Sequence, residues 1–313
     1  MKKVAFQIDS PFALNLATDT SYAFMTELEA KGYAVYYYEP QSLGYGGGLV
    51  SARMDRFYSS SFLKQDFKTN YQKAILNDFY AVFIRQNPPF DMAYITSTYI
   101  LDFLKKDGVR ILNDSTSVRN YSEKLFALEF EAFMPKTLLT TSYEEAREFF
   151  KSQGEIVIKP LYSYGGDGVF YIPEDDKNLF SAFNILQKAY GSGVPVICQQ
   201  YVPGIKTIGD KRILLVDGKY FKALNRVQAA DMSVSNTRNG AKALTCDINQ
   251  KEEQIIAAIS PRLRELGLSF VGIDVIGGEY LTEINVTSPT GLVLMNRIYQ
   301  TKLESKALSL MGF

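Results

Sequence analysis

The residues best suited to chemistry in this chain are three oxygen-bearing side chains, Asp274, Glu283 and Asn285. They lie in the segment 270–289, whose two apolar, β-branched halves flank a pair of glycines and predict a β-hairpin. Glu283 and Asn285 are two residues apart and share one strand face, with Asp274 roughly opposite. An acid buried between apolar neighbours is costly unless a cation meets it. Two carboxylates and an amide oxygen on one face favour Mg²⁺ bound together with phosphates, although a solvated hairpin face is the simpler alternative.

A glycine-rich turn, YSYGGDG, spans residues 162–168. It is not a P-loop, because the G-x-x-x-x-G-K-[ST] pattern is absent and a strand follows it rather than a helix. Gly165, Gly166 and Gly168 leave backbone N–H groups open to phosphate oxygens, whereas an ordinary β-turn, the alternative, would need one glycine. Lys159 ends the strand before this turn, and a nucleotide phosphate is a natural partner for a lysine in such an apolar strand.

Further cations occur at Lys124, Arg212 and Arg226. Each alone is better explained as a surface charge. Together with Lys159, the glycine-rich turn and the three oxygen ligands, they indicate a single site for phosphoryl transfer. In such a site lysine and arginine neutralise the moving phosphate, and metal ions bridge its oxygens.

The first 120 residues predict a small α/β domain beside this site. Residues 2–8 and 33–38 predict strands around a helix that begins near Asp19, a β-α-β unit with parallel pairing. Gly44–Gly48 lacks the G-x-G-x-x-G spacing and predicts a flexible surface loop. Open α/β sheets bind ligands at the carboxyl ends of their strands. The other expected elements are a strand at 81–85, a rigid loop at 87–91, a helix at 96–106 and a strand at 109–112.

The remainder, residues 121–313, predicts mixed strands and helices that carry the candidate residues. Lys124 lies on a short helix, strands flank the glycine-rich turn, and Asp217-Gly218 joins a hairpin. The other expected elements are strands at 135–140, 194–202, 211–216 and 220–223, and helices at 143–153, 180–190 and 252–266. The fold class expected is therefore α/β, in part α+β, with domains at 1–120 and 121–313.

Composition narrows the classes of function. The 313 residues carry 34 basic and 34 acidic side chains, which argues against a nucleic-acid or anionic-membrane partner. The sequence contains no run of eighteen apolar residues and therefore predicts no membrane-spanning helix. The N-terminus looks like the start of a signal peptide, but Gln7 and Asp9 interrupt its apolar run. Cys198 and Cys246 have no metal-binding spacing and fit a reducing cytoplasm. The absence of histidine excludes Ser-His-Asp and Cys-His catalysis and imidazole-based zinc sites.

The sequence resembles the ATP-grasp superfamily and, within it, the bacterial glutathione synthetases. The likeness runs in order over nearly the whole chain, and its most specific part is FVGIDVIGGEYLTEINVTSP at 270–289. It implies an ATP-grasp fold (121–313) preceded by a pre-ATP-grasp domain (1–120), with a lid subdomain at about 121–200 and a catalytic subdomain at about 201–313. The other matching segments are Asp19–Ser21, RQNPPFD at 85–91, EKLFALEF around Lys124, IVIKPLYSYGGDGVF around Lys159, QQYVPGI at 199–205 and GDKRILLVDG at 209–218.

The resemblance also implies residue roles. Asp274, Glu283 and Asn285 would hold two Mg²⁺ ions, with Glu283 bridging and Mn²⁺ a possible substitute. Arg212 and Arg226 would face the transferred phosphoryl group and the acceptor carboxylate, together with Lys159 as catalytic residues. The ATP contacts would come from Lys124, Lys159, Gly165, Gly166, Gly168, Gln200, Tyr201, Val202 and Asp210. The substrate contacts would come from Asp19, Ser21, Arg85, Asn236, Ser288 and Pro289.

Two segments depart from the family pattern. The usual aspartate before Pro-Pro is Asn87 here. In the loop 228–243 the expected Arg-Gly-Asn and Gly-Gly become SVSNTRNGAK, so that Asn236 matches the family asparagine but the arginine is displaced to position 238. These departures leave the nucleotide and metal residues intact and bear on the choice of acceptor and amine.

The activity that the resemblance implies is ATP-dependent ligation of γ-glutamylcysteine and glycine to glutathione through an acylphosphate, in a cytoplasmic homo-oligomer, a tetramer. No protein nucleophile is needed, in keeping with the missing histidine. Another ATP-grasp peptide or amino-acid ligase, or a nucleotide-binding protein without turnover, remains open. A NAD-dependent oxidoreductase is disfavoured because no glycine fingerprint follows the first strand.

Overall fold

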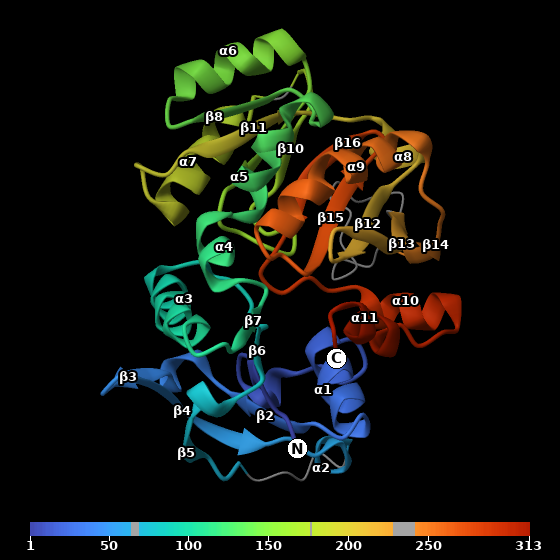
Figure 1. The fold of residues 1–313 in the computed structure, drawn as a ribbon. Coiled ribbons are helices and arrows are strands. Elements are labelled where there is room, and N and C mark those ends of the chain that lie inside the picture. Colours follow the sequence, from blue (N-terminus) through green and yellow to red (C-terminus); the bar gives the residue numbers. More distant parts are fainter. Residues whose placement is uncertain (64–68, 176, 228–241) are drawn as a thin grey trace.

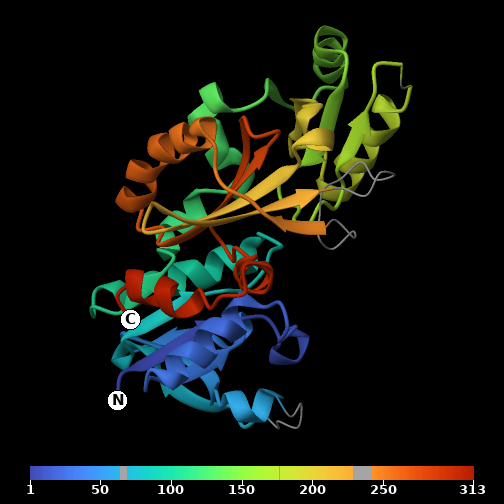
Figure 2. The same cartoon turned by 90° about the vertical axis from the view of Figure 1, so that its right-hand side faces the viewer.

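Three β-sheets organise the part of the chain that the computed structural model describes, residues 1–63, 69–175, 177–227 and 242–313 (Figure 1). The sheet of the N-terminal residues lies at the bottom of Figure 1, and the sheet of β8 to β11 lies at the top. The third sheet, which carries the candidate metal residues, lies between them. The view turned by 90° again shows the N-terminal part at the bottom, with the second and third sheets side by side above it (Figure 2).

The first sheet has a parallel centre and an antiparallel edge. As the sequence predicts, β1 pairs in parallel with β2, and it also pairs in parallel with β6. On the far side β2 runs antiparallel to β4, which also pairs with β3 and β5. The strands are β1 Lys3–Gln7, β2 Ala34–Tyr38, β3 Gly44–Gly46, β4 Leu49–Arg56, β5 Gln72–Ile75, β6 Ala81–Ile84 and β7 Arg110–Leu112. The helices are α1 Thr20–Ala30, α2 Ser59–Leu63, α3 Met92–Lys105 and α4 Ser115–Asn120, with 3₁₀ turns η1 Pro11–Ala13, η2 Pro40–Ser42 and η3 Leu76–Asp78.

The prediction of a flexible loop at Gly44–Gly48 is wrong. This segment forms β3 and the turn of a hairpin, in which Gly46 pairs with Leu49. Gly47 and Gly48 have φ values of 60° and 83°, and two successive positive φ angles are what a two-residue hairpin turn requires. The helix predicted from residue 96 begins at Met92 instead, because the Asp91 carboxylate accepts a hydrogen bond from the Tyr94 N–H and caps it.

The second sheet is antiparallel, in the order β10-β9-β11-β8. It forms as predicted around the glycine-rich turn. Helix α6 covers the predicted residues because Ser142 caps its start and Gly154, with φ of 77°, follows its end. The elements are α5 Glu123–Ala127, η4 Leu128–Phe133, β8 Thr137–Thr140, α6 Tyr143–Gln153, β9 Ile156–Pro160, β10 Phe170–Ile172, α7 Leu179–Tyr190 and β11 Val196–Gln200.

The third sheet, in the order β14-β13-β12-β15-β16, is antiparallel throughout. Both predicted hairpins are present in it, joined by Asp217-Gly218 and by the turn after Ile276. The elements are α8 Gly204–Thr207, β12 Asp210–Val216, β13 Lys219–Val227, β14 Lys242–Thr245, α9 Gln250–Glu265, β15 Phe270–Ile276, β16 Tyr280–Asn285, α10 Leu292–Tyr299 and α11 Glu304–Leu310.

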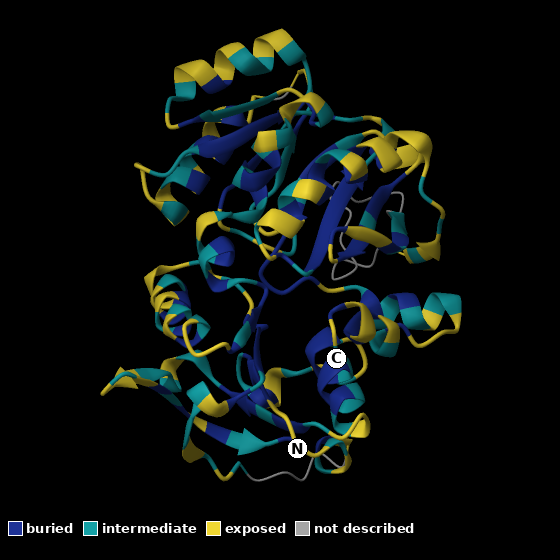
Figure 3. Ribbon diagram, in the orientation of Figure 1, coloured by how far each residue is buried: buried dark blue, intermediate teal, exposed yellow. Residues whose placement is uncertain are grey.

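The hydrophobic core distinguishes the second sheet from the other two. Its strands pack with α6 and α7 in a cluster of their own, which includes Ile158, Phe183 and Cys198. By contrast, one cluster contains both Phe6 of β1 and Phe270 of β15. Figure 3 shows buried strands at the centre of each sheet and an exposed outer face on α6. The first and third sheets are therefore fastened together, and the second packs as a separate unit above the site.

A salt-bridge network on α3 and α4 gives a test of the fold by pH. Asp102 contacts Lys105 at 2.8 Å and Arg119 at 2.9 Å, and it accepts a hydrogen bond from Ser115. Burial alone would raise the pKa of Asp102, but these contacts outweigh it and hold the pKa at about 2, below the ordinary value of 3.8. We expect Asp102→Asn to lower the free energy of unfolding by about 1–2 kcal/mol at pH 7 in urea titrations.

The pH dependence of that difference has a defined sign. Because the folded pKa lies below the unfolded one, the stabilisation is complete above about pH 4 and is lost as the pH falls through about 2. The variant and the wild type should therefore converge in acid. Glu148→Gln, at an exposed position of α6, serves as a control. A difference between Asp102→Asn and wild type that stays constant down to pH 2 would contradict this account.

Candidate active site

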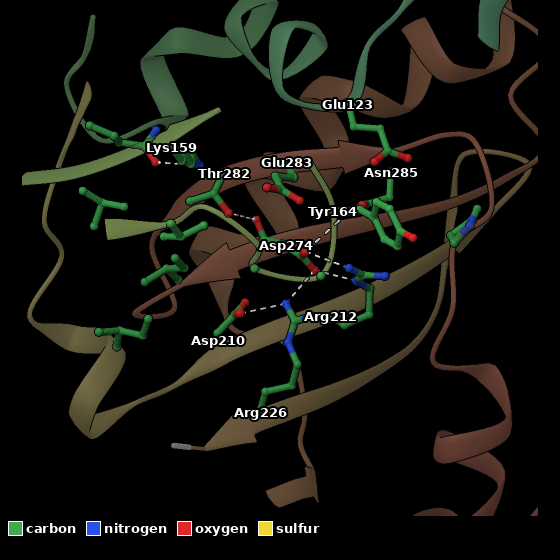
Figure 4. Close-up of a pocket in the computed structure, with 18 of the residues that line it drawn as sticks. Glu123, Lys159, Tyr164, Asp210, Arg212, Arg226, Asp274, Thr282, Glu283 and Asn285 are labelled. Carbon is green, nitrogen blue, oxygen red and sulfur yellow. Dashed lines mark hydrogen bonds and ion pairs between the residues drawn. The ribbon is translucent and has the colours of Figure 1, made fainter. Parts of the chain in front are cut away.

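A cavity of about 270 Å³ opens between the second and third sheets. Its floor is formed by β12, β13, β15 and β16, and its roof by the glycine-rich turn and the strands β9 and β11. Figure 4 shows the polar side chains that project into it. Of the predicted site residues, the cavity is lined by Lys159, Gly165, Gly166, Gln200, Tyr201, Val202, Asp210, Arg212, Arg226, Asp274, Glu283, Asn285, Ser288 and Pro289.

The three oxygen-bearing residues meet as the hairpin predicts. Asp274 on β15 pairs directly with Glu283 on β16, and Asn285 pairs with Gly272. Their side chains converge in Figure 4, and Asp274 is only 6% exposed. The Asn285 amide nitrogen donates to the Gly272 carbonyl at 3.1 Å, which leaves the amide oxygen on the side of the cavity.

Two arginines meet the buried acid. Arg212 contacts Asp274 through both carboxylate oxygens, with Nε–Oδ1 at 2.5 Å and Nη2–Oδ2 at 2.8 Å. Arg226 lies 2.9 Å from Asp274 Oδ1 and 2.7 Å from Asp210 Oδ2. Burial alone would raise the pKa of Asp274, but the two guanidinium groups outweigh it and hold the pKa well below its usual range. Burial raises the pKa of Asp210 to about 6, and the negative charge of Asp274 adds to the rise, although Arg226 acts in the opposite direction.

The donor set fits Mg²⁺. Within the described ranges no group of three or more His, Cys, Asp or Glu residues could hold a metal. Asp274, Glu283 and Asn285 instead offer two carboxylates and one amide oxygen, hard ligands for an ion that keeps water and phosphate in its remaining positions. Glu283 has a single cationic neighbour in the described chain, Lys124 at 3.6 Å, so its oxygens are the least committed of the set.

The two lysines occupy different positions. Lys159 lines the cavity, is 7% exposed and donates to the Gln199 side chain at 3.2 Å, with no carboxylate of the described residues within 4 Å. Burial lowers its pKa. Lys124 does not line the cavity and donates to the Ser163 carbonyl at 2.5 Å. Lys124 therefore holds the glycine-rich turn above Glu283, while Lys159 points into the space below.

The glycines also divide by role. Gly165 and Gly166 line the cavity with φ values of 72° and 87°, as a close backbone approach to a ligand requires. Gly168 does not line it. With φ of 73°, Gly168 packs on Pro160, where an added Cβ would lie 3.1 Å from Pro160 Cγ.

The segment Gln200–Val202 crosses the cavity at the end of β11. The Gln200 N–H donates to the Lys136 carbonyl at 2.8 Å, and the Tyr201 N–H donates to the Glu155 carbonyl at 3.0 Å. Within the described chain the Val202 N–H makes no hydrogen bond, so it is the backbone donor of this segment that a ligand can use.

The predicted substrate residues lie at the junction with the first sheet. Arg85 donates to the Ser21 hydroxyl at 3.1 Å and to the Pro289 carbonyl at 3.0 Å. Asp19 caps α1 by accepting from the Tyr22 N–H at 2.8 Å. Asp19, Ser21 and Arg85 do not line the cavity, whereas Ser288 and Pro289 do. Asn236 and the loop 228–241 lie outside the described residues.

Sequence reasoning missed several cavity residues. Glu123 lines the cavity but was not predicted, because an acidic residue in the first turn of a helix is already explained by its favourable interaction with the helix dipole. Gln199, Thr282 and Thr287 also line the cavity and carry no chemistry that a single sequence would reveal. The likeness of 199–205 to the family was the only signal that pointed near Gln199.

Comparison with known families places the chain. Residues 2–119 match the N-terminal domain of prokaryotic glutathione synthetase, and residues 123–300 match its ATP-grasp domain. The chain belongs to the prokaryotic glutathione synthetase family. The resemblance stated from the sequence and the ATP-grasp fold are thereby confirmed. As a family member the chain is an ATP-dependent ligase, with the family's general dependence on a divalent metal.

Curated relatives agree over nearly the full length. The chain is 40% identical to glutathione synthetase of Agrobacterium fabrum, covering 93% of this chain and 90% of that protein. It is 38% identical to the Brucella melitensis protein of the same name, covering 96% and 95%. It is 36% identical to that of Thermosynechococcus vestitus, covering 98% of both.

Solved structures share the fold. D-cycloserine synthetase DcsG matches with a TM-score of 0.66 at 15% identity over 98% of both chains. The ATP-grasp ligase PsnB matches with a TM-score of 0.64 at 17% identity over 99% of both chains. At these identities the likeness is one of fold alone.

Proposed function

We propose that this protein is a glutathione synthetase that joins γ-glutamylcysteine to glycine and converts ATP to ADP and phosphate. The observation that supports the proposal is that a chain matching the family over residues 2–119 and 123–300 has a cavity lined by the residues this reaction needs. Within that one space lie Lys159, the paired arginines Arg212 and Arg226, and the oxygen ligands of the hairpin.

The nucleotide would lie between the two sheets. The free Val202 N–H would bind the adenine edge, Lys159 the phosphates, and the N–H groups of Gly165 and Gly166 would cover the phosphates from above. Lys124 supports this arrangement indirectly by fixing the turn through Ser163.

The reaction would proceed in two displacements. An oxygen of the cysteinyl carboxylate attacks the γ-phosphorus as the bond to the ADP oxygen breaks, which gives an acylphosphate and ADP. The glycine amine, having lost a proton, then attacks the acyl carbon, and inorganic phosphate leaves with the original carboxylate oxygen. Arg212 and Arg226 lie on one wall of the cavity, where their charges would stabilise the phosphoryl oxygens in both steps.

Asp274, Glu283 and Asn285 would hold two Mg²⁺ ions, replaceable by Mn²⁺, and such ions would neutralise the nucleotide phosphates. We propose a division into domains at 1–120 and 121–313, with a lid at about 121–200. The separate core of the second sheet supports the lid. A cytoplasmic homo-tetramer is proposed from the family likeness. None of the helices in the described ranges has the length and hydropathy that crossing a bilayer requires.

A second candidate is an ATP-grasp ligase for a different acceptor or amine. The observation that favours it is Asn87, which lines the cavity where the family has an aspartate and which accepts a hydrogen bond from Ser288 at 2.9 Å. Other dipeptides and amines offered in turn would identify such a ligase.

The test of the proposed function is Mg²⁺-dependent release of ADP with γ-glutamylcysteine and glycine, each also omitted in turn. We expect release only when both are present, with glutathione as the product. Release with other dipeptides or amines, but not with this pair, would favour the second candidate.

A further inference from the structure

The outer face of α3 carries an apolar row of side chains that the cavity does not use. Met92, Tyr99 and Phe103 are 70%, 54% and 43% exposed. Thr96, also exposed, lies between Met92 and Tyr99 in the same row. These positions are spaced by four, three and four residues, the spacing with which one helix packs along another. The opposite face of α3 is already buried in the core of the first sheet, for example through Leu101.

The hairpin of β3 and β4 extends this apolar row. Tyr45 is 48% exposed, and its ring stacks on that of Phe103 with the centroids 4.4 Å apart. In Figure 1 the hairpin lies beside α3, and Figure 3 shows exposed residues on both elements. The side chains of Tyr45, Met92, Tyr99 and Phe103 together expose roughly 400 Å² of apolar surface, a patch of the size that often serves to bind a partner.

The row on α3 is complementary to a second copy of itself. Two α3 helices can pack antiparallel about a two-fold axis midway between Thr96 and Tyr99. Met92 of each copy then lies opposite Phe103 of the other, and Thr96 lies opposite Tyr99. Each large ring therefore meets a smaller or more flexible side chain, and both copies use the same surface, as a two-fold interface requires.

The charges at the ends of α3 favour the same antiparallel arrangement. Asp91 precedes the helix, Lys106 follows it, and both are exposed. In the described part of the chain no carboxylate lies within 4 Å of the Lys106 ammonium, and the neighbouring Asp107 carboxylate accepts a hydrogen bond from an amide of η3 instead. An antiparallel copy brings each Asp91 towards the Lys106 of the other copy and sets the two helix dipoles against each other.

We propose that α3 and the hairpin of β3 and β4 form a two-fold interface with a second copy of this chain, centred on Thr96 and Tyr99. Packing the two rows together removes apolar surface of both copies from water at once. Met92, Thr96, Tyr99 and Phe103 do not line the cavity, so the interface does not depend on the proposed reaction. In a tetramer, this contact would be one of the two-fold interfaces that build the assembly.

The first test is Tyr99→Glu, which places two like charges at the centre of the interface, one from each copy. We expect the dissociation constant of the interface to rise about a hundredfold or more, so that the mass measured by light scattering at micromolar concentration falls to half that of the wild type. Tyr58→Glu is the matched control, because Tyr58 is 53% exposed and, like Tyr99, lies beneath an arginine. The control should keep the wild-type mass, and circular dichroism should show wild-type helix content in both variants.

The second test locates the interface directly. Thr96→Cys treated with a short bis-maleimide should give a covalent dimer in high yield, because the two-fold axis brings the two copies of position 96 close together. Ser152→Cys, at an exposed position of α6, has the same native thiols and should stay monomeric on a denaturing gel. A monomeric wild type, a Tyr99→Glu protein of wild-type mass, or cross-linking of Thr96→Cys no better than that of Ser152→Cys would each overturn the interface. Failure of the wild type to form glutathione would overturn the proposed function alone.

Discussion

Replacing Glu283 by glutamine should lower kcat about a thousandfold while leaving the fold intact. The substitution keeps the volume and hydrogen-bonding shape of the side chain but removes a charge from the set formed with Asp274 and Asn285. An ion that stabilises transition-state charge contributes several kcal/mol, and about 1.4 kcal/mol corresponds to a factor of ten in rate. Glu283 is the less committed of the two carboxylates in this set, since its cationic neighbour in the described chain is Lys124 at 3.6 Å, whereas Asp274 contacts two arginines more closely.

The measurement is single-turnover ADP formation, with Mn²⁺ binding followed by electron paramagnetic resonance as a second readout. Glu279→Gln, at the exposed turn of the same hairpin, is the control and should behave as wild type in both. Residual activity above a tenth of wild type, with normal Mn²⁺ binding, would remove Glu283 from the metal site.

Replacing Lys159 by methionine should weaken ATP binding about a hundredfold without destabilising the protein. Lys159 is buried and faces the cavity with no carboxylate partner among the described residues, so its charge is expected to serve the ligand rather than the fold. Loss of charged hydrogen bonds to phosphate, at about 1.5–3 kcal/mol, accounts for a change of this size. Isothermal titration with ATP measures the affinity, and urea titration measures the stability.

Lys211→Met provides the contrasting variant. Lys211 lies on β12 of the third sheet and is also buried, but its ammonium contacts Glu252 at 2.8 Å, and Glu252 is fully buried. Breaking that pair should cost about 3–5 kcal/mol of stability because it leaves a buried carboxylate unpaired. If Lys159→Met lost stability as Lys211→Met does and kept its ATP affinity, the assignment of Lys159 to the nucleotide would fail.

The hairpin at 270–289 shows what the sequence can determine. Alternation of apolar and polar residues around two glycines was enough to predict both strands and to place Asp274 opposite Glu283. The expectation that a cation meets Asp274 is also confirmed. The sequence could not tell that the cations are Arg212 and Arg226, because that depends on the pairing of β12 with β15, in which Arg212 lies directly opposite Asp274.

Other features depend on contacts between distant residues and left no local signal. The hairpin at Gly44–Gly48 was missed because its strand residues do not alternate, and the turn was recognisable only from two positive φ angles. The hydrogen bonds of Arg85 to the Ser21 hydroxyl and to the Pro289 carbonyl exist only once the end of β6 is packed against α1 and the segment after β16.

The floor and the roof of the cavity belong to different hydrophobic cores. The second sheet's cluster of Ile158, Phe183 and Cys198 is distinct from the clusters that join the first and third sheets. The contact of Lys124 with the Ser163 carbonyl joins the helix before this sheet to the glycine-rich turn. The floor of the cavity is thus fixed by the larger cores, and its roof is carried by a unit that packs on its own.

The most direct test of the account is the fate of the carboxylate oxygen of the acceptor. γ-Glutamylcysteine labelled with ¹⁸O in its cysteinyl carboxylate is incubated with ATP, glycine and the enzyme, and the products are examined by mass spectrometry. An acylphosphate route predicts that one labelled oxygen passes to inorganic phosphate for each glutathione formed. Unlabelled phosphate, or label in AMP, would contradict transfer of the γ-phosphoryl group to the acceptor carboxylate and with it the proposed mechanism.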